Sequence, residues 1–90
     1  MRAVFQVHGQ VQGVGFRWFA VRQAQALELA GWVRNEFDGT VSGEAAGDPG
    51  QLEAFRELLE EGPPSARISR LDWWVADEGE SLPFPFSVRG

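Results

Sequence analysis

The stretch from His8 to Arg17, HGQVQGVGFR, separates two segments whose apolar residues repeat with different periods. Before it, Ala3, Phe5 and Val7 alternate with more polar residues, which predicts a β-strand with one apolar face. After it, apolar residues recur at helical spacing, at Phe16, Ala20, Ala24 and Leu27. The pattern therefore predicts a strand, a glycine-rich loop and an amphipathic helix that continues until Gly31.

The rest of the chain predicts a hairpin, a second helix and two further strands. Asp38-Gly39, between two alternating runs, is typical of a two-residue type I′ turn. Asp48 is a suitable cap for a helix that has Pro49 in its first turn, and Gly62 ends that helix. Strands are expected over residues 68–76 and 84–88.

This order, β-α-β-β-α-β with an extra strand, predicts an α+β fold of the ferredoxin-like class. Such a fold is a sandwich in which an antiparallel sheet carries two helices on one face, here with a short C-terminal strand. The sequence has no internal repeat, linker or low-complexity segment. A single domain over residues 1–90 is therefore expected.

The composition limits the classes of function. The chain has no Cys and no Lys, and its single His leaves no nucleophile–base pair and no metal-ligand spacing, so neither a metal nor a cofactor is expected. A net charge of −5 argues against nucleic-acid binding. The N-terminal residues contain no signal peptide or membrane span, which predicts a cytoplasmic protein without membrane contact.

The glycine-rich loop is predicted to bind an anion. It precedes a helix whose first N–H groups have no intrahelical partner, at the positive end of the helix dipole. Arg17 lies in the same first turn, where a cation is unfavourable for the dipole, and a bound phosphate with bidentate hydrogen bonds would compensate. The alternative is a surface arginine paired with a carboxylate. The glycines fall at 9, 13 and 15, so the dinucleotide and P-loop patterns do not match.

A second candidate residue lies in the following strand. Asn35 alternates onto one face with Val33 and Phe37, and an amide on an apolar face needs a hydrogen-bond partner. A right-handed crossover makes the first two strands parallel, so Asn35 is expected at the same sheet edge as the glycine loop and Arg17. An asparagine satisfied by turn backbone is the alternative interpretation.

Two blocks of the sequence resemble the acylphosphatase family: VHGQVQGVGFR at residues 7–17, and GWVRN at 31–35 continuing through GTV at 39–41 to Gly47. The resemblance covers essentially the whole chain. It implies hydrolysis of the carboxyl-phosphate bond of a small-molecule acyl phosphate, without metal or cofactor, by a monomer. It also implies that Asn35 orients the attacking water and that the phosphoryl group is bound by the loop and the arginine, at Gln10, Val11, Gln12, Gly13, Val14, Gly15, Phe16 and Arg17.

The sequence is compatible with two other classes of function. One is a regulatory module that binds phosphate or an acyl phosphate in the same pocket with negligible turnover. The other is an RNA-binding module, although the acidic charge and a third strand without stacking aromatics, TVSGEAA, count against it. His8 alternates onto the face opposite Phe5 and Val7, so a non-catalytic role is predicted for it.

Overall fold

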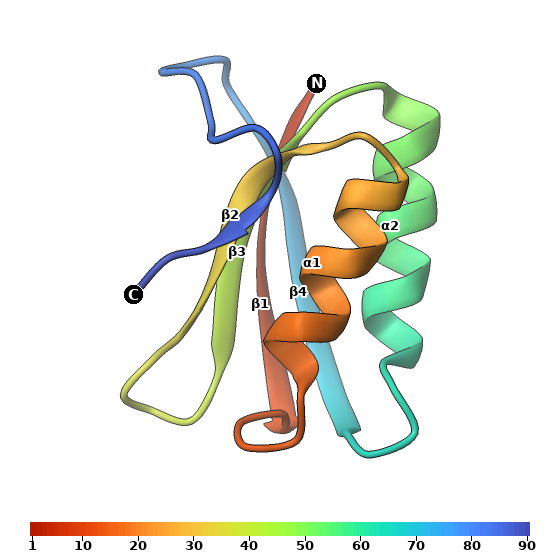
Figure 1. Cartoon of the computed structure of the whole chain (residues 1–90), viewed down its shortest axis with the longest axis vertical. Coiled ribbons are helices and arrows are strands. Elements are labelled where there is room, and N and C mark those ends of the chain that lie inside the picture. Colours follow the sequence, from red (N-terminus) through yellow and green to blue (C-terminus); the bar gives the residue numbers. More distant parts are fainter.

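The computed structural model describes residues 1–90 and shows a five-stranded sheet with two helices on one face (Figure 1). The elements in chain order are β1 Arg2–Gln10, α1 Phe16–Ala26, β2 Ala30–Asn35, β3 Val41–Ala46, α2 Pro49–Glu61, β4 Arg67–Ala76 and β5 Ser87–Val88. The predicted element order and the ferredoxin-like α+β class are confirmed. Neither helix is long and apolar enough to cross a membrane.

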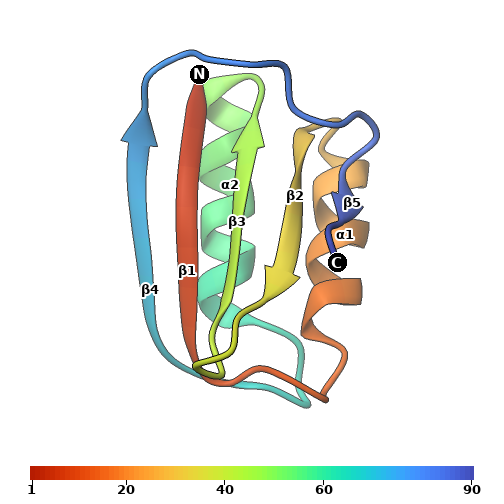
Figure 2. The same cartoon turned by 90° about the vertical axis from the view of Figure 1, so that its left-hand side faces the viewer.

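The strand order in the sheet is β4-β1-β3-β2-β5 (Figure 2). Strand β3 pairs antiparallel with both β1 and β2, so β1 and β2 run parallel and their carboxyl ends lie at the same edge of the sheet. The glycine loop leaves the sheet at that edge, and Asn35 is the last residue of β2. Strands β1 to β4 pair antiparallel, whereas β5 pairs parallel with β2, so the five-stranded sheet is mixed.

The core lies between the sheet and the helices and is rich in phenylalanine. The rings of Phe5 and Phe55 meet edge to face with centroids 5.8 Å apart, and Phe55 meets Phe86 in the same way at 5.7 Å. All three side chains are completely buried, and each contributes roughly 1.5–3 kcal/mol. Phe86 comes from the C-terminal segment, so its burial fixes that segment beside α1 and β2.

Helix α1 ends a turn earlier than the periodicity predicted. It stops at Ala26, and the N–H of Leu27 donates to the carbonyl oxygen of Gln23. Glu28 then adopts a left-handed conformation with φ 58°, which turns the chain so that Leu29 is completely buried. Gly31, the predicted end of the helix, lies inside β2 instead.

The β2–β3 hairpin also differs from the predicted two-residue type I′ turn. Five residues separate β2 from β3, and the N–H of Glu36 donates to the carbonyl oxygen of Thr40 at 2.8 Å. The loop closed by this bond is Phe37, Asp38 and Gly39, of which only Gly39 has a positive φ, 92°. The carboxylate of Asp38 accepts hydrogen bonds from the Thr40 backbone N–H at 3.0 Å and from its hydroxyl at 2.6 Å. This self-bonded acidic side chain favours a type I turn followed by a left-handed glycine. Phe37 is fully exposed at the tip, so the prediction that it shares an apolar face with Asn35 is wrong.

Helix α2 follows its sequence signals closely. The Asp48 side chain accepts a hydrogen bond from the N–H of Gly50 at 2.9 Å, which confirms the predicted cap. Pro49 is the first helical residue, and Gly62 is the C-cap, with its N–H bonded to the carbonyl oxygen of Leu58. The final strand is shorter than predicted, because only Ser87–Val88 pairs with β2.

Candidate active site

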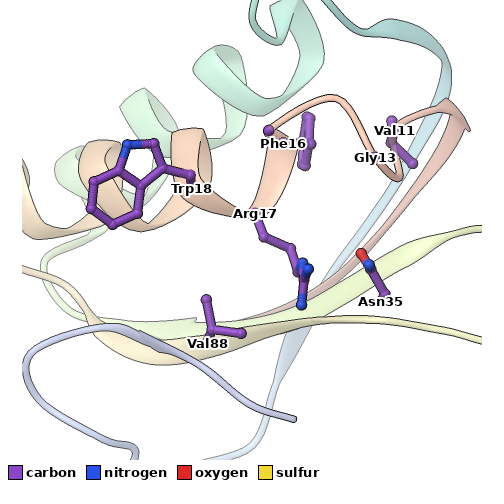
Figure 3. Close-up of a pocket in the computed structure, with 8 residues that line it drawn as sticks. Val11, Gly13, Phe16, Arg17, Trp18, Asn35 and Val88 are labelled. Carbon is purple, nitrogen blue, oxygen red and sulfur yellow. The ribbon is translucent and has the colours of Figure 1, made fainter.

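A pocket of about 280 Å³ lies between the loop after β1, the first turn of α1, the end of β2 and strand β5 (Figure 3). Its lining consists of Val11, Gly13, Gly15, Phe16, Arg17, Trp18, Asn35 and Val88. The structure thus brings Arg17 and Asn35 to one pocket from two separate elements, as the parallel arrangement of β1 and β2 predicted. Trp18 and Val88 are additional members of the lining.

The backbone of the glycine loop provides a run of unpaired N–H groups. Gly15 caps α1 in the left-handed conformation, φ 81°, and no side chain caps the helix. The first helical bond runs from the N–H of Phe19 to the carbonyl oxygen of Gly15 at 3.0 Å, so the N–H groups of residues 16–18 precede it. The N–H groups of residues 11–15 donate to no protein acceptor either. Unpaired amides at a helix N-terminus form an anion-binding environment.

Two side chains hold this loop in place through three hydrogen bonds. The amide of Gln12 donates to the carbonyl oxygens of Glu36 at 2.7 Å and Thr40 at 2.9 Å, which fastens the loop to the β2–β3 hairpin. The hydroxyl of Ser65 donates to the carbonyl oxygen of Val14 at 2.7 Å, from the connection between α2 and β4. The Gln12 side chain and the Val14 carbonyl group therefore hold the loop in place, and the backbone N–H groups of both residues stay unpaired.

The first part of the motif belongs to the sheet. Gly9 lies at an irregularity in the β1–β4 pairing, and a Cβ added there would come within 2.0 Å of the carbonyl oxygen of Arg67. Gln10 ends β1 opposite Arg67 and is exposed. Of the eight residues expected to bind phosphate, five line the pocket, and Gln10, Gln12 and Val14 do not.

Arg17 has no carboxylate partner. It is exposed, it takes part in none of the ion pairs of the chain, and α1 has no acidic residue in its first turn. The alternative interpretation, a surface arginine paired with a carboxylate, is therefore wrong. Figure 3 shows its guanidinium reaching from the helix toward the side chain of Asn35. The positive charge of Arg17 therefore has no carboxylate partner, and it faces the same pocket as the unpaired N–H groups of the loop.

Asn35 carries a buried oxygen without a hydrogen-bond partner. The atom is Oδ1, and it is the one buried side-chain polar atom of the protein that lacks a partner. Turn backbone does not satisfy it, so the second alternative interpretation is wrong as well. An unsatisfied buried acceptor costs roughly 1–3 kcal/mol, which a hydrogen-bond donor entering the pocket would recover.

Glu36 and His8, the titratable residues near the site, are hydrogen-bonded to residues outside the pocket. The carboxylate of Glu36 is bonded to Arg34 Nε at 2.8 Å and to the Ser42 hydroxyl, and these two bonds lower the pKa of Glu36. His8 is bonded through Nε2 to Asp72 at 2.9 Å, and this bond lowers the pKa of Asp72. His8 is absent from the pocket lining, as the strand alternation predicted.

Trp18 and Val88 are the lining residues that sequence reasoning missed. Trp18 directly follows Arg17 in the first turn of α1, so its position next to the anion site was a readable signal. Val88 enters the pocket only because β5 pairs with β2, where Val88 lies opposite Val33. A strand of two residues carries no periodicity that predicts such a pairing.

Comparisons with known proteins point to one family. The family model for acylphosphatase matches residues 3–84 of the chain. An acylphosphatase of Thermococcus kodakarensis is 46% identical over 80 residues, which are 88% of each chain. An acylphosphatase of Actinobacillus succinogenes is 51% identical over 67 residues, 74% of each chain. The crystal structure of an acylphosphatase from Bacillus subtilis superimposes with a TM-score of 0.93 at 34% identity, covering 99% of this chain and 98% of that one.

Proposed function

This chain belongs to the acylphosphatase family, the enzymes of acyl phosphate hydrolysis, and from that premise we propose how its pocket performs the reaction. The loop amides and Arg17 hold the phosphoryl group, and Asn35 orients the attacking water. The observation that carries the proposal is the unpaired Oδ1 of Asn35, which lines the same pocket as the free guanidinium and the free N–H groups.

The reaction requires few protein groups because its leaving group is stable. A carboxylate has a conjugate acid with a pKa of about 4, so it leaves without a proton donor. The water oxygen bonds to phosphorus while the bond from phosphorus to the carboxyl oxygen breaks, and that electron pair stays on the carboxylate. Arg17 is the only titratable residue in the lining, so the water's proton passes to a phosphate oxygen.

Rate enhancement then comes from positioning and charge. Negative charge on the equatorial phosphoryl oxygens meets the guanidinium of Arg17 and the N–H groups between Val11 and Trp18. Each well-placed donor of this kind accounts for about a hundredfold or more in rate. The carbonyl oxygen of Asn35 accepts a hydrogen bond from the water and turns its lone pair toward phosphorus.

Hydrolysis of acetyl phosphate by variants tests these roles. Arg17→Ala and Asn35→Ala should each lower kcat/KM by about a hundredfold or more. Inorganic phosphate, used as a competitive inhibitor, should bind more weakly to Arg17→Ala but not to Asn35→Ala. Arg22→Ala is the matched control, because Arg22 is an exposed arginine of the same helix that neither forms an ion pair nor lines the pocket.

The result that would overturn the proposal is full activity in either Arg17→Ala or Asn35→Ala, with the fold of each variant verified by circular dichroism. Weaker phosphate inhibition in Asn35→Ala would place that residue in binding instead of water orientation. We also propose that residues 1–90 act as a single domain and as a monomer, because one core is shared by the sheet and both helices.

A further inference from the structure

The peptide between Val14 and Gly15 is not held by any backbone hydrogen bond. The N–H of Gly15 donates to no protein acceptor, and no backbone N–H bonds to the carbonyl oxygen of Val14. The peptide lies between two glycines with positive φ, Gly13 at 75° and Gly15 at 81°, and a Cβ at either position would meet nothing within 4 Å. Contacts of the backbone therefore do not fix the direction in which this peptide faces.

A side-chain hydrogen bond holds this peptide instead. The hydroxyl of Ser65 donates to the carbonyl oxygen of Val14 at 2.7 Å, from 51 positions further along the chain. The C=O and the N–H of a trans peptide point in opposite directions, and this peptide is trans. The bond therefore directs the N–H of Gly15 away from Ser65, and Gly15 lines the pocket. The bond also polarises the peptide, which makes that N–H a stronger donor.

Ser65 is itself held by a stiff turn. It lies in the connection between α2 and β4, at the same end of the molecule as the glycine loop (Figure 2). The N–H of Ala66 donates to the carbonyl oxygen of Pro63 at 3.0 Å, which closes a turn around Ser65. Pro63 and Pro64 have a fixed φ and stiffen this turn. The pairing of β1 with β4 extends to the last residue of β1 and the first of β4, so the sheet places the turn beside the loop.

We propose that Ser65 is a positioning residue, which orients the N–H of Gly15 so that this group binds an oxygen of the phosphoryl group. The inference rests on the proposed function, because it assumes that the loop amides hold the phosphoryl group. Ser65 does not line the pocket and acts only through the peptide. Without the hydroxyl, the peptide is free to rotate between its two flanking glycines. An N–H that is oriented before binding avoids the cost of ordering it.

The binding of inorganic phosphate to Ser65→Ala tests this role apart from the chemical step. The Ki of phosphate against acetyl phosphate hydrolysis should rise about tenfold, the effect of weakening one charge-assisted hydrogen bond. The kcat/KM for acetyl phosphate should fall by about the same factor, mainly through KM, because the N–H already holds the phosphoryl group in the bound substrate. Ser65→Thr keeps a hydroxyl and should recover most of the phosphate affinity.

The amide resonance of Gly15 gives a readout that a loss of stability would not change. In wild type, saturation with inorganic phosphate should move the Gly15 amide proton downfield, because the N–H then donates to an anion. In Ser65→Ala, saturated to the same degree, this shift should be smaller. Ser69→Ala is the matched control, because Ser69 is an exposed serine of β4 outside the pocket, and it should keep the phosphate Ki and the Gly15 shift of wild type.

An unchanged Ki in Ser65→Ala together with an unchanged Gly15 shift would overturn this inference and leave the proposed function standing. Equal Ki values for Ser65→Ala and Ser65→Thr, both above that of wild type, would also overturn it, because the hydroxyl would then not be the cause. In wild type, a lack of any phosphate-induced shift among the amides of residues 11–18 would overturn the proposed function, and this inference with it.

Discussion

At the scale of single residues, the pocket keeps two polar groups without the partners that folded proteins normally supply. The Oδ1 of Asn35 is buried and unbonded, and the guanidinium of Arg17 faces no carboxylate. The buried oxygen costs stability, and a cation in the first turn is unfavourable for the helix dipole. Active sites commonly retain such costs because the same groups serve the reaction. Removing one of them should therefore separate stability from activity.

Asn35→Leu should raise the free energy of unfolding by about 1 kcal/mol and at the same time abolish hydrolysis of acetyl phosphate. The reason is that the side chain of Asn35 makes no hydrogen bond within the protein, so an apolar side chain of similar size removes an unsatisfied acceptor without breaking a bond. Urea denaturation measures the first effect. A variant that is less stable than wild type by more than about 1 kcal/mol would contradict this account of Asn35.

Two glycines of the same motif should respond differently to substitution by alanine. A Cβ at Gly15 meets nothing within 4 Å. Gly15→Ala should therefore lower the free energy of unfolding only by the strain of a left-handed φ, about 1–2 kcal/mol. A Cβ at Gly9 would overlap the backbone of β4, and Gly9→Ala should cost about 3 kcal/mol. Urea midpoints compare the two. Equal costs would show that Gly9 has no special role in the β1–β4 pairing.

The two residues that line one pocket as the sequence predicted, Arg17 and Asn35, are residues that conflict with their local surroundings. Arg17 opposes the helix dipole and Asn35 is an amide on an apolar face, so each required a partner that the pattern did not supply. Trp18 and Val88 raised no such conflict, because an exposed tryptophan and a valine near the end of the chain are unremarkable in a sequence. The bonds from the Gln12 side chain to the hairpin carbonyl oxygens could not be read from the sequence, because they depend on how the hairpin packs against the loop.

At the scale of elements, the glycine loop depends on the β2–β3 hairpin through Gln12. Gln12→Ala removes both bonds to the hairpin carbonyl groups, so the free N–H groups lose part of their preorganisation. The KM for acetyl phosphate should rise about tenfold, since a small displacement of binding groups has effects of this order or larger. Steady-state kinetics measures it, with Gln51→Ala on the exposed face of α2 as the control. An unchanged KM would show that the loop keeps its shape unaided.

The hairpin should also respond to acid. Hydrogen bonds from Thr40 lower the pKa of Asp38 below its ordinary value of about 4. A lowered folded-state pKa means that the stabilisation is complete above the unfolded-state pKa and is lost as the pH falls through the folded-state pKa. Thr40→Val should raise the pKa of Asp38, which NMR titration measures. The free energy of unfolding of the variant should fall less than that of wild type as the pH drops below about 4, which urea denaturation measures. An unshifted Asp38 titration in the variant would contradict the assignment to Thr40.

Element types were predictable from periodicity, but their ends were not. The end of α1 is set by Glu28, a residue with no special preference for the left-handed conformation that it adopts to bury Leu29. The hairpin was expected to follow the Asp-Gly signal, and the bonds of Asp38 to Thr40 selected a three-residue loop instead. In both places a tertiary or side-chain contact outweighed local preference.

At the scale of the whole molecule, the topology assembles the site from distant parts of the chain. Parallel β1 and β2 place the glycine loop and Asn35 at one edge, and this followed from the helical crossover that connects the two strands. The wall formed by β5 did not follow, because its pairing with β2 depends on the burial of Phe86. The proposed reaction uses the glycine loop and Asn35, and β5 contributes Val88 to the lining of the same pocket.

In the proposed reaction the pocket directs water to phosphorus, and an oxygen label in the water shows in which product the new bond lies. Wild-type enzyme should hydrolyse acetyl phosphate in ¹⁸O-labelled water, with the spontaneous reaction subtracted, and mass spectrometry should then locate the label. The account predicts one labelled oxygen in inorganic phosphate and none in acetate, because the new bond forms at phosphorus. Label in acetate would mean attack at the carbonyl carbon and would contradict the account.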